Sequence, residues 1–194
     1  MFSQFGQDEA ILALHPEPGT FLEIGASDGI FLSDTYLLEL HGWRGLCVEP
    51  NPEEYKRLAQ LRRCATENVA CANVRGQLPF QIVSNRGWSG LIDYPHEFNQ
   101  PQIEKELVMK VIDVPVLPLQ ELLDKHGLND LDYFSLDVEG AELSVLQSID
   151  WERAKPHIIT VEINSDPSPI PEYLNHRGYV YVQTLGSDQL YRLP

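Results

Sequence analysis

Residues 21–29, with the sequence FLEIGASDG, combine a short apolar strand, a glycine turn and two carboxylates. Gly25 and Gly29 permit a tight turn and a close approach of a ligand to the backbone, and the amides of a following helix offer hydrogen-bond donors. The dinucleotide fingerprint G-x-G-x-x-G needs a further glycine between them. Glu23 and Asp28 would repel a diphosphate but attract a cationic amine and a sulfonium. The turn therefore predicts S-adenosylmethionine as the ligand.

A further carboxylate stands where the ribose of such a ligand would lie. Residues 45–50 (GLCVEP) have the pattern of a second buried strand, and this strand ends at Glu49, 20 residues after Gly29. In nucleotide-binding folds an acid at this place accepts hydrogen bonds from the ribose. Either motif alone is weak evidence, because glycine turns and strand-ending acids are common. Their joint spacing carries the prediction.

Three more carboxylates follow a later apolar strand, in the segment 137–142 (DVEGAE). Ligands of open α/β sheets bind at the carboxyl ends of the strands, which is where these acids would lie. Glu142 is explained by a helix start, where an acid complements the helix dipole. An acid such as Asp137 at the end of an apolar strand is costly without a partner. We therefore predict Asp137 and Glu139 as catalytic residues that orient an acceptor hydroxyl or take its proton.

Methyl transfer from a sulfonium is an in-line displacement, so alignment of donor and acceptor supplies most of the catalysis, roughly 7–11 kcal/mol. A carboxylate acting as general base adds about two to four decades. Glu162, at the end of another strand, is a candidate substrate contact. With Asp137, Glu139, Asn164 and Asp166 it also forms a set of hard oxygen ligands that suit magnesium or calcium. No histidine ligand spacing accompanies them, and we expect no metal.

The composition is that of one globular domain spanning residues 1–194, with 43% hydrophobic and 22% charged residues. A net charge of −15 disfavours nucleic acid as a partner. No apolar run approaches the roughly 18 residues of a membrane helix, and no signal peptide pattern is present, so we expect a cytoplasmic protein without membrane contact. The three cysteines, Cys47, Cys64 and Cys71, form no CxxC pair, which argues against a zinc cluster. Nothing in the sequence indicates an oligomeric state.

Helical and strand patterns alternate along the chain, which is typical of an α/β domain with a mostly parallel sheet. Between 67 and 84 the pattern predicts two strands joined by a turn at 73–76. Residues 85–106 have no clear period, and their aromatic residues Trp88, Tyr94, His96 and Phe98 suit stacking on a flat acceptor or simple loop packing. Further strands are expected at about 20–24, 111–116, 131–136, 157–163, 179–185 and 189–193, and helices at about 7–14, 35–40, 53–62, 119–126, 141–149 and 171–176.

Together these motifs resemble the FkbM family of S-adenosylmethionine-dependent methyltransferases. The matching segments are residues 3–8 (SQFGQD), 21–29 with 33–35 (SDT), 42–52 (GWRGLCVEPNP), 89–91 (SGL) and 136–142 (LDVEGAE). Several motifs in the same order, spread over nearly the whole chain, are far more specific than the glycine turn alone. The family more often has Ser-Asn-Thr where this chain has Ser33-Asp34-Thr35, which argues against a direct ligand contact from position 34.

The resemblance implies a class I methyltransferase fold: a Rossmann-like three-layer sandwich with a seven-stranded, mostly parallel sheet whose last strand is antiparallel. It implies O-methylation of a hydroxyl on a sugar or other small-molecule acceptor. By similarity, the methionine side of the cofactor would meet Glu23, Gly25 and Gly29, with Ser33 nearby. Glu49 would bind the ribose, and Asn68 with the two residues after it would approach the adenine.

Two other functions remain open from the sequence. A nicotinamide-dependent oxidoreductase is disfavoured by the missing glycine in the turn. A non-catalytic cofactor-binding or scaffolding module would keep the fold and lack turnover. Replacement of Asp137 and Glu139 separates an enzyme from a scaffold, because an enzyme would lose methyl transfer while still binding its cofactor.

Overall fold

The computed structural model describes residues 1–92, 94, 108–163 and 168–194. Of the residues singled out in the sequence, His96, Phe98, Asn164 and Asp166 lie outside these ranges. Within them, no helix has the length and apolar character that crossing a bilayer requires.

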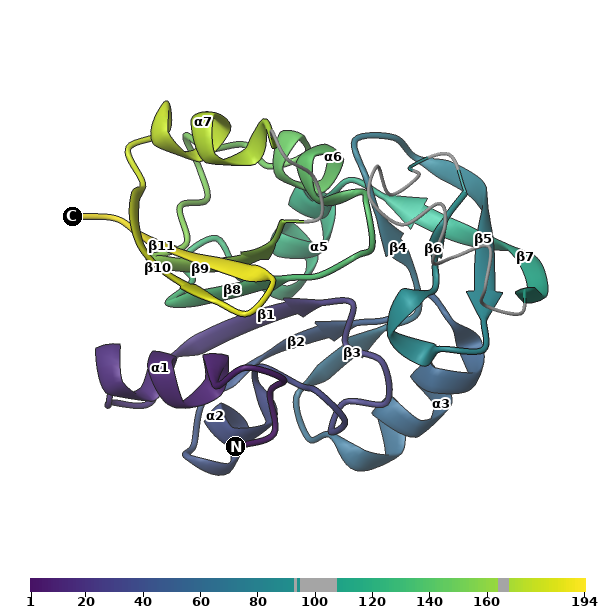
Figure 1. The fold of residues 1–194 in the computed structure, drawn as a ribbon, viewed down its shortest axis with the longest axis horizontal. Helices are drawn as coiled ribbons and strands as arrows, with labels where there is room; N and C mark the ends of the chain where they lie inside the picture. The colour runs from purple at the N-terminus through teal and green to yellow at the C-terminus, as the bar shows by residue number, and fades with distance from the viewer. Residues whose placement is uncertain (93, 95–107, 164–167) are drawn as a thin grey trace.

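A seven-stranded sheet forms the centre of the molecule, with the strand order β10-β11-β9-β8-β1-β2-β3 (Figure 1). Neighbouring strands from β9 to β3 are parallel, whereas β11 runs antiparallel to both of its neighbours. This confirms the predicted class I methyltransferase architecture and its reversed last strand. The strands are β1 (Thr20–Ile24), β2 (Arg44–Val48), β3 (Ala65–Glu67), β8 (Tyr133–Leu136), β9 (Ile158–Glu162), β10 (Val180–Leu185) and β11 (Asp188–Arg192).

Helices cover both faces of this sheet, which gives the three layers (Figure 1). On one face Phe21 of β1 packs in a core with residues of α1, α2 and α3, and on the other face Leu22 packs with residues of α5, α6 and α7. The alternation follows from the two-residue period of a strand. The helices are α1 (Gln7–Leu14), α2 (Tyr36–Leu40), α3 (Pro52–Leu61), α5 (Leu119–His126), α6 (Glu142–Gln147) and α7 (Ile170–Asn175).

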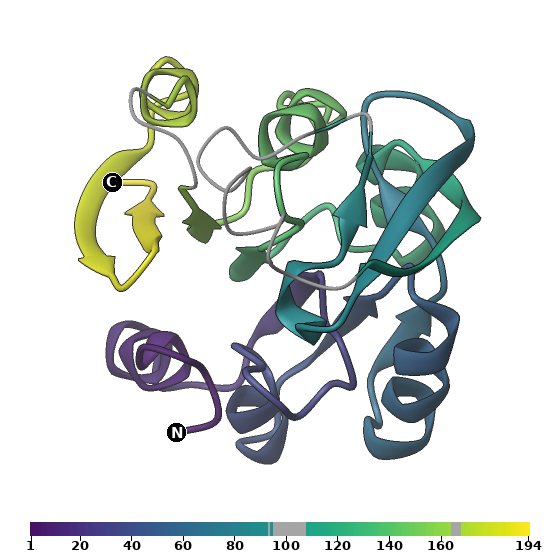
Figure 2. The same ribbon diagram turned by 45° about the vertical axis from the view of Figure 1, so that its right-hand side comes forward.

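A second, four-stranded sheet lies beyond the β3 end of the main sheet and has its own small apolar core (Figure 2). Its order is β4-β7-β5-β6. The long strands β5 and β7 pair antiparallel, and β6 pairs antiparallel with β5. The elements are β4 (Ala70–Cys71), β5 (Gly76–Val83), the 3₁₀ turn η1 (Arg86–Trp88), β6 (Gly90–Leu91) and β7 (Val108–Leu117).

The second sheet corrects two expectations. The strands on either side of residues 73–76 exist, but they do not form a hairpin, because β7 lies between them and pairs with both. The connecting segment is bound to α6 instead: the Asn73 amide donates to Ser144 Oγ (3.0 Å), and that hydroxyl donates to Asn73 Oδ1 (2.9 Å). In addition, part of the segment expected as irregular from residue 85 is ordered as η1 and β6.

Candidate active site

The carboxyl ends of β1, β2 and β8 lie side by side in the sheet register. The next residues along the chain are Gly25, Glu49 and Asp137, which brings the two predicted motifs and the acid segment to one edge, as expected. Backbone hydrogen bonds continue past the strand ends: the Gly25 amide donates to the Val48 carbonyl (3.0 Å), and the Asp137 amide donates to the Ile24 carbonyl (3.1 Å). The glycine turn and the acid segment are therefore fixed relative to each other.

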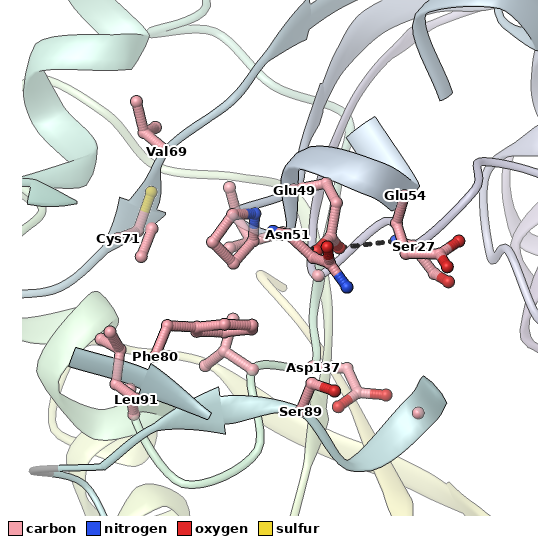
Figure 3. A pocket seen from close by; sticks show the side chains of 17 residues that line it. Ser27, Glu49, Asn51, Glu54, Val69, Cys71, Phe80, Ser89, Leu91 and Asp137 are labelled. Carbon is pink, nitrogen blue, oxygen red and sulfur yellow. Dashed lines mark hydrogen bonds between the residues drawn. The ribbon is translucent and has the colours of Figure 1, made fainter. Parts of the chain in front are cut away.

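A cavity opens at this edge, beside the strand ends. Its apolar end is made by Val69 and Cys71 with Phe80 and Leu91 opposite them, and Glu49, Ser27 and Asp137 lie toward the other end (Figure 3). We call it the first cavity. Its full lining is Ile24, Gly25, Ser27, Glu49, Pro50, Asn51, Glu54, Val69, Ala70, Cys71, Phe80, Gly87, Ser89, Leu91, Asp137, Val138 and Ala141.

Glu49 is buried and oriented by backbone amides. Its Oε2 accepts from the Ser27 amide (2.8 Å), drawn in Figure 3, and its Oε1 accepts from the Asn51 amide (2.8 Å). Asn68 braces the same turn from behind, since its Nδ2 donates to the carbonyl oxygens of Glu49 (2.8 Å) and Pro50 (3.1 Å). A carboxylate oxygen accepts more than one hydrogen bond, so these amides fix the Glu49 side chain without excluding a ligand hydroxyl.

Gly25 occupies a place where no other residue fits. Its φ is +91°, and a Cβ there would lie 1.7 Å from the Asp137 carbonyl oxygen. The turn then passes Ser27, which lines the first cavity with a left-handed φ of +47°. The buried Ser27 hydroxyl has no hydrogen-bond partner among the described residues. A buried hydroxyl at a cavity wall is suited to a polar ligand.

Glu23 is buried beneath the turn, and its carboxylate is hydrogen-bonded to other residues of the protein. Its Oε1 accepts from the Asp34 amide (2.8 Å), and its Oε2 accepts from the hydroxyls of Ser33 (3.0 Å) and Thr35 (2.6 Å). Arg62 Nη1 lies 3.3 Å from Oε2, and the Cys47 thiol donates to the same oxygen at 3.4 Å. Glu23 is absent from the lining of the first cavity, where we expected it near the cofactor, and lines a second cavity beside it.

Three further predicted site residues also lie behind the cavity walls. Gly29 packs against α3, because a Cβ there would lie 2.5 Å from Leu58 Cδ1, and it lines neither cavity. Ser33 lines neither cavity and caps α2 instead, accepting from the Tyr36 amide (3.0 Å). Asn68 supports the Glu49 turn, as described above, whereas the two residues after it, Val69 and Ala70, do line the first cavity.

The second cavity adjoins the first through Ile24, Gly25, Gly87 and Asp137, which line both. It is the larger of the two, and residues of the N-terminal segment and of the turn between β10 and β11 contribute to its lining. Its full lining is Gln4, Phe5, Gln7, Glu23, Ile24, Gly25, Leu32, Asp34, Asn85, Gly87, Trp88, Ser135, Asp137, Glu139, Glu162, Ser187 and Asp188. Position 34, which the sequence argued against as a contact, therefore faces this cavity.

Asp137 keeps exposed surface and lines both cavities, whereas Glu139 lines only the second of the two. Desolvation by the surrounding chain, followed by the charges of Glu162 and Glu139, raises the pKa of Asp137 well above the ordinary range. Burial, with Glu162 and Glu142 nearby, raises the pKa of Glu139 to about 10. Glu139 also has a left-handed φ of +59°, which is rare outside glycine. Strained backbone and displaced acid pKa values are features of functional sites.

Glu142 begins α6, as the sequence predicted from its position, and its carboxylate accepts from the amides of Val138 (3.1 Å) and Gly140 (3.0 Å). One of its carboxylate oxygens and one oxygen each from Asp137 and Glu162 lie within 4.8 Å of one another. Since Glu142 already serves the backbone of the turn, its main role is to hold the segment that carries Asp137.

Sequence reasoning missed the wall that the second sheet provides. Phe80 of β5 and Leu91 of β6 are buried and face Val69 and Cys71 across the first cavity (Figure 3). Ser89, in a segment matched to the family pattern, also lines it. No local signal places β5 there, because its position depends on pairing with β7.

A family model described as the methyltransferase FkbM domain matches residues 23–181, which is most of the chain and includes all the strand ends of the site. The chain belongs to the FkbM methyltransferase family. It is therefore an S-adenosylmethionine-dependent methyltransferase, which decides against the nicotinamide-dependent oxidoreductase and the non-catalytic module. No curated protein matches this FkbM methyltransferase.

Solved methyltransferase structures resemble it at low sequence identity. One from Geobacter sulfurreducens has 11% identity and a TM-score of 0.53, covering 100% of this chain and 82% of that one. A precorrin-6y C5,15-methyltransferase from Geobacter metallireducens has 12% identity and a TM-score of 0.49, with 96% and 88% covered. A TehB-like methyltransferase from Corynebacterium glutamicum has 11% identity and a TM-score of 0.49, with 99% and 89% covered. At 11% identity, the likeness to the Geobacter sulfurreducens methyltransferase supports the fold alone.

The residues of the first cavity fit the cofactor of an FkbM methyltransferase. The partnerless Ser27 hydroxyl and the Glu49 carboxylate suit a nucleoside with free hydroxyls, and the apolar end suits a flat base. None of the residues that line the first cavity within the described chain is a lysine, arginine or histidine. Such a lining offers no countercharge to a diphosphate and suits a positively charged nucleoside.

Proposed function

We propose that this FkbM methyltransferase transfers a methyl group from S-adenosylmethionine to a hydroxyl of a sugar or other small-molecule acceptor. The observation that carries the proposal is the pair of adjoining cavities that share Asp137. The first cavity would hold the cofactor, with its ribose on Glu49, its base between Val69 and Phe80, and its methionine end near Gly25. The second cavity would hold the acceptor.

The lining of the second cavity supports a polyhydroxylated acceptor. Ser135, Ser187 and Asn85 offer uncharged polar groups, and the carboxylates accept hydrogen bonds from hydroxyls. Trp88 and Phe5 add aromatic surface on which a sugar ring can pack, as the sequence suggested for Trp88. A site built for hydroxyls discriminates against acceptors that lack them, because its buried polar groups would then be unpaired.

S-adenosylmethionine, when bound, supplies an electrophilic methyl group on a sulfonium. The chain's part is to align the acceptor oxygen with that carbon and to remove the proton. Asp137 would hold the acceptor hydroxyl and would take its proton when the methyl group is transferred. The raised pKa of Asp137 makes its carboxylate a stronger base than an ordinary aspartate. Glu139 and Glu162 would bind other hydroxyls of the acceptor.

The proposed domain spans residues 1–194 as one unit. The family match covers residues 23–181, and the second cavity also takes its lining from Gln4 before that range and from Asp188 after it. Removal of the first eight residues would therefore be expected to impair acceptor use.

The proposal is tested with a labelled methyl donor and a panel of free sugars and small alcohols. Label should pass to a neutral hydroxyl acceptor and should be lost with Asp137→Asn, while the exposed Asp130→Asn, which makes the same charge change, should retain it. We expect addition of EDTA to leave the rate unchanged. Transfer to amine nitrogen only, or an unchanged rate for Asp137→Asn, would overturn the assignment of an O-methyltransferase with Asp137 as base.

A further inference from the structure

A buried arginine lies behind the glycine turn, outside both cavities. Arg62 follows α3 directly as its C-terminal cap residue, and its side chain has no exposed surface. Its guanidinium lies over the rings of Phe21 and Tyr36, 5.4 and 5.5 Å from their centres. A buried arginine is costly unless its donors are satisfied, so its partners indicate what it does.

Three of these partners belong to the segment that follows β1. Nη1 donates to the Gly29 carbonyl (3.0 Å) and to Ser33 Oγ (3.2 Å), and Nη2 donates to Thr35 Oγ1 (2.9 Å). We call residues 25–35 the cofactor loop. One rigid, planar group thus ties three points of the cofactor loop to the end of α3.

Two acids complete the arrangement. Nη1 lies 3.3 Å from Glu23 Oε2 at the base of the loop, and Nε lies 3.0 Å from Glu39 Oε2 on α2. Glu39 in turn accepts from the amides of Arg63 (3.1 Å) and Cys64 (2.6 Å), just after α3. Arg62 therefore joins β1, α2 and α3 at one buried point.

The backbone of the cofactor loop needs such support. Left-handed φ values occur at Gly25 (+91°), Ser27 (+47°), Gly29 (+82°) and Leu32 (+59°). Ser27 and Leu32 carry side chains, so this conformation is strained at both residues and persists only where the surroundings impose it. The hydrogen bonds from Arg62 reach the loop at Gly29 and just after Leu32, so they support this shape.

The shape of the cofactor loop sets both cavities. Gly25 and Ser27 line the first cavity, and Leu32 and Asp34 line the second. The other end of α3 reaches the first cavity as well, through Glu54 in its first turn. A change at Arg62 would therefore be transmitted to cofactor and acceptor sites that Arg62 does not touch.

We propose that Arg62 is a positioning residue for methyl transfer, which holds the cofactor loop in the shape that S-adenosylmethionine binding requires. The inference rests on the proposed placement of the cofactor in the first cavity. It does not depend on the identity of the acceptor. Neither sequence motif nor family resemblance pointed to this residue.

The test measures binding of S-adenosylhomocysteine by calorimetry, which needs no acceptor, together with melting temperature. Arg62→Lys keeps the charge beside Glu23 but loses the planar fork. The double variant Glu23→Gln with Arg62→Met removes both members of this buried ion pair, while Glu39 keeps the amides of Arg63 and Cys64 as partners. We expect both variants to fold and to bind the ligand about tenfold more weakly or worse, the loss expected when charge-assisted hydrogen bonds that hold the loop are removed. The exposed Arg63→Lys is the matched control and should bind like wild type.

Steady-state kinetics separates positioning from a purely structural role. With Arg62→Lys, the KM for S-adenosylmethionine should rise about tenfold, while kcat at saturating cofactor should stay within about threefold of wild type, because bound cofactor restores the loop. Wild-type affinity in folded Arg62→Lys and in the double variant would overturn the inference and leave the proposed function standing. Failure of the wild-type protein to bind S-adenosylhomocysteine would overturn both.

Discussion

At the scale of single side chains, we propose that recognition of the cofactor depends most on Glu49. Amides of Ser27 and Asn51 hold its two oxygens at the wall of the first cavity. Glu49→Gln keeps the shape but replaces a charged acceptor with an amide, so affinity for S-adenosylhomocysteine should fall roughly 10- to 100-fold, the equivalent of one or two charge-assisted hydrogen bonds.

Calorimetry measures this loss, and Glu53→Gln, an exposed acid on α3 that lines neither cavity, is its control. Equal affinities for Glu49→Gln and wild type would show that Glu49 does not bind the ribose.

Asp137 should control the pH dependence of the reaction. As general base it must be ionised, and its raised pKa means that protonation persists to higher pH than for an ordinary aspartate. The value of kcat/KM should therefore keep rising with pH above about 5, where an unperturbed carboxyl is already ionised. Asp137→Asn should lower kcat by about 10²- to 10⁴-fold and flatten this rise while leaving cofactor binding intact.

A pH series of initial rates for both proteins, beside the Asp130→Asn control, gives the comparison. A wild-type profile that is flat from pH 5 upward would be inconsistent with this role of Asp137.

The sequence predicted residues at strand ends better than residues inside the turn. Glu49 and Asp137 lie where expected because parallel strands end at one edge, whatever the details of the loops. Glu23 lies one position before the end of β1, and the two-residue period of a strand points it to the face of Phe21, toward α2 and away from the first cavity. The motif comparison did not use this alternation.

At the level of elements, the second sheet closes the first cavity. Phe80 of β5 supplies an aromatic surface opposite Val69. Phe80→Leu keeps most of the buried volume while removing the ring, so the fold should persist and affinity for S-adenosylhomocysteine should fall about three- to tenfold, in line with the energy of one aromatic pair.

The measurement is ligand affinity with circular dichroism as a check on folding, and Phe31→Leu, at an exposed phenylalanine that lines neither cavity, is the control. Unchanged affinity in folded Phe80→Leu would place the base elsewhere.

The main sheet and its helices were predictable because each element has a local signal. Gly127, which has a left-handed φ, ends α5 at the expected position. The turn between β10 and β11 closes the predicted hairpin. The second sheet was not predictable in its order. β4 has only two residues, and its partner β7 begins more than 30 residues later, so no local pattern reveals the pairing.

For the whole molecule, buried acids make stability depend on pH. Burial, followed by neighbouring charges where they occur, raises the pKa of Asp34, Asp137, Glu139 and Asp188. The unfolded chain releases these protons near pH 4, whereas the folded chain retains them to higher pH. Between about pH 4 and these raised pKa values, the folded state binds more protons than the unfolded chain. The free energy of unfolding is therefore highest at the low-pH end of this range and falls as pH rises.

We expect the melting temperature of the free protein to fall between pH 5.5 and pH 8.5, on the order of 5 °C or more. Asp34→Asn, which removes one of the raised groups, should reduce the slope, and Asp130→Asn should not. A melting temperature that rises over this range would contradict the assignment of raised pKa values to these carboxyls.

The central claim is that acids at adjacent strand ends hold a positively charged nucleoside, with its reactive carbon toward Asp137. A crystal structure of the protein with S-adenosylhomocysteine tests it most directly. We expect to find the ribose hydroxyls on Glu49, the base between Val69 and Phe80, and the sulfur facing Asp137. A ligand bound outside the first cavity, or a ribose turned away from Glu49, would contradict it.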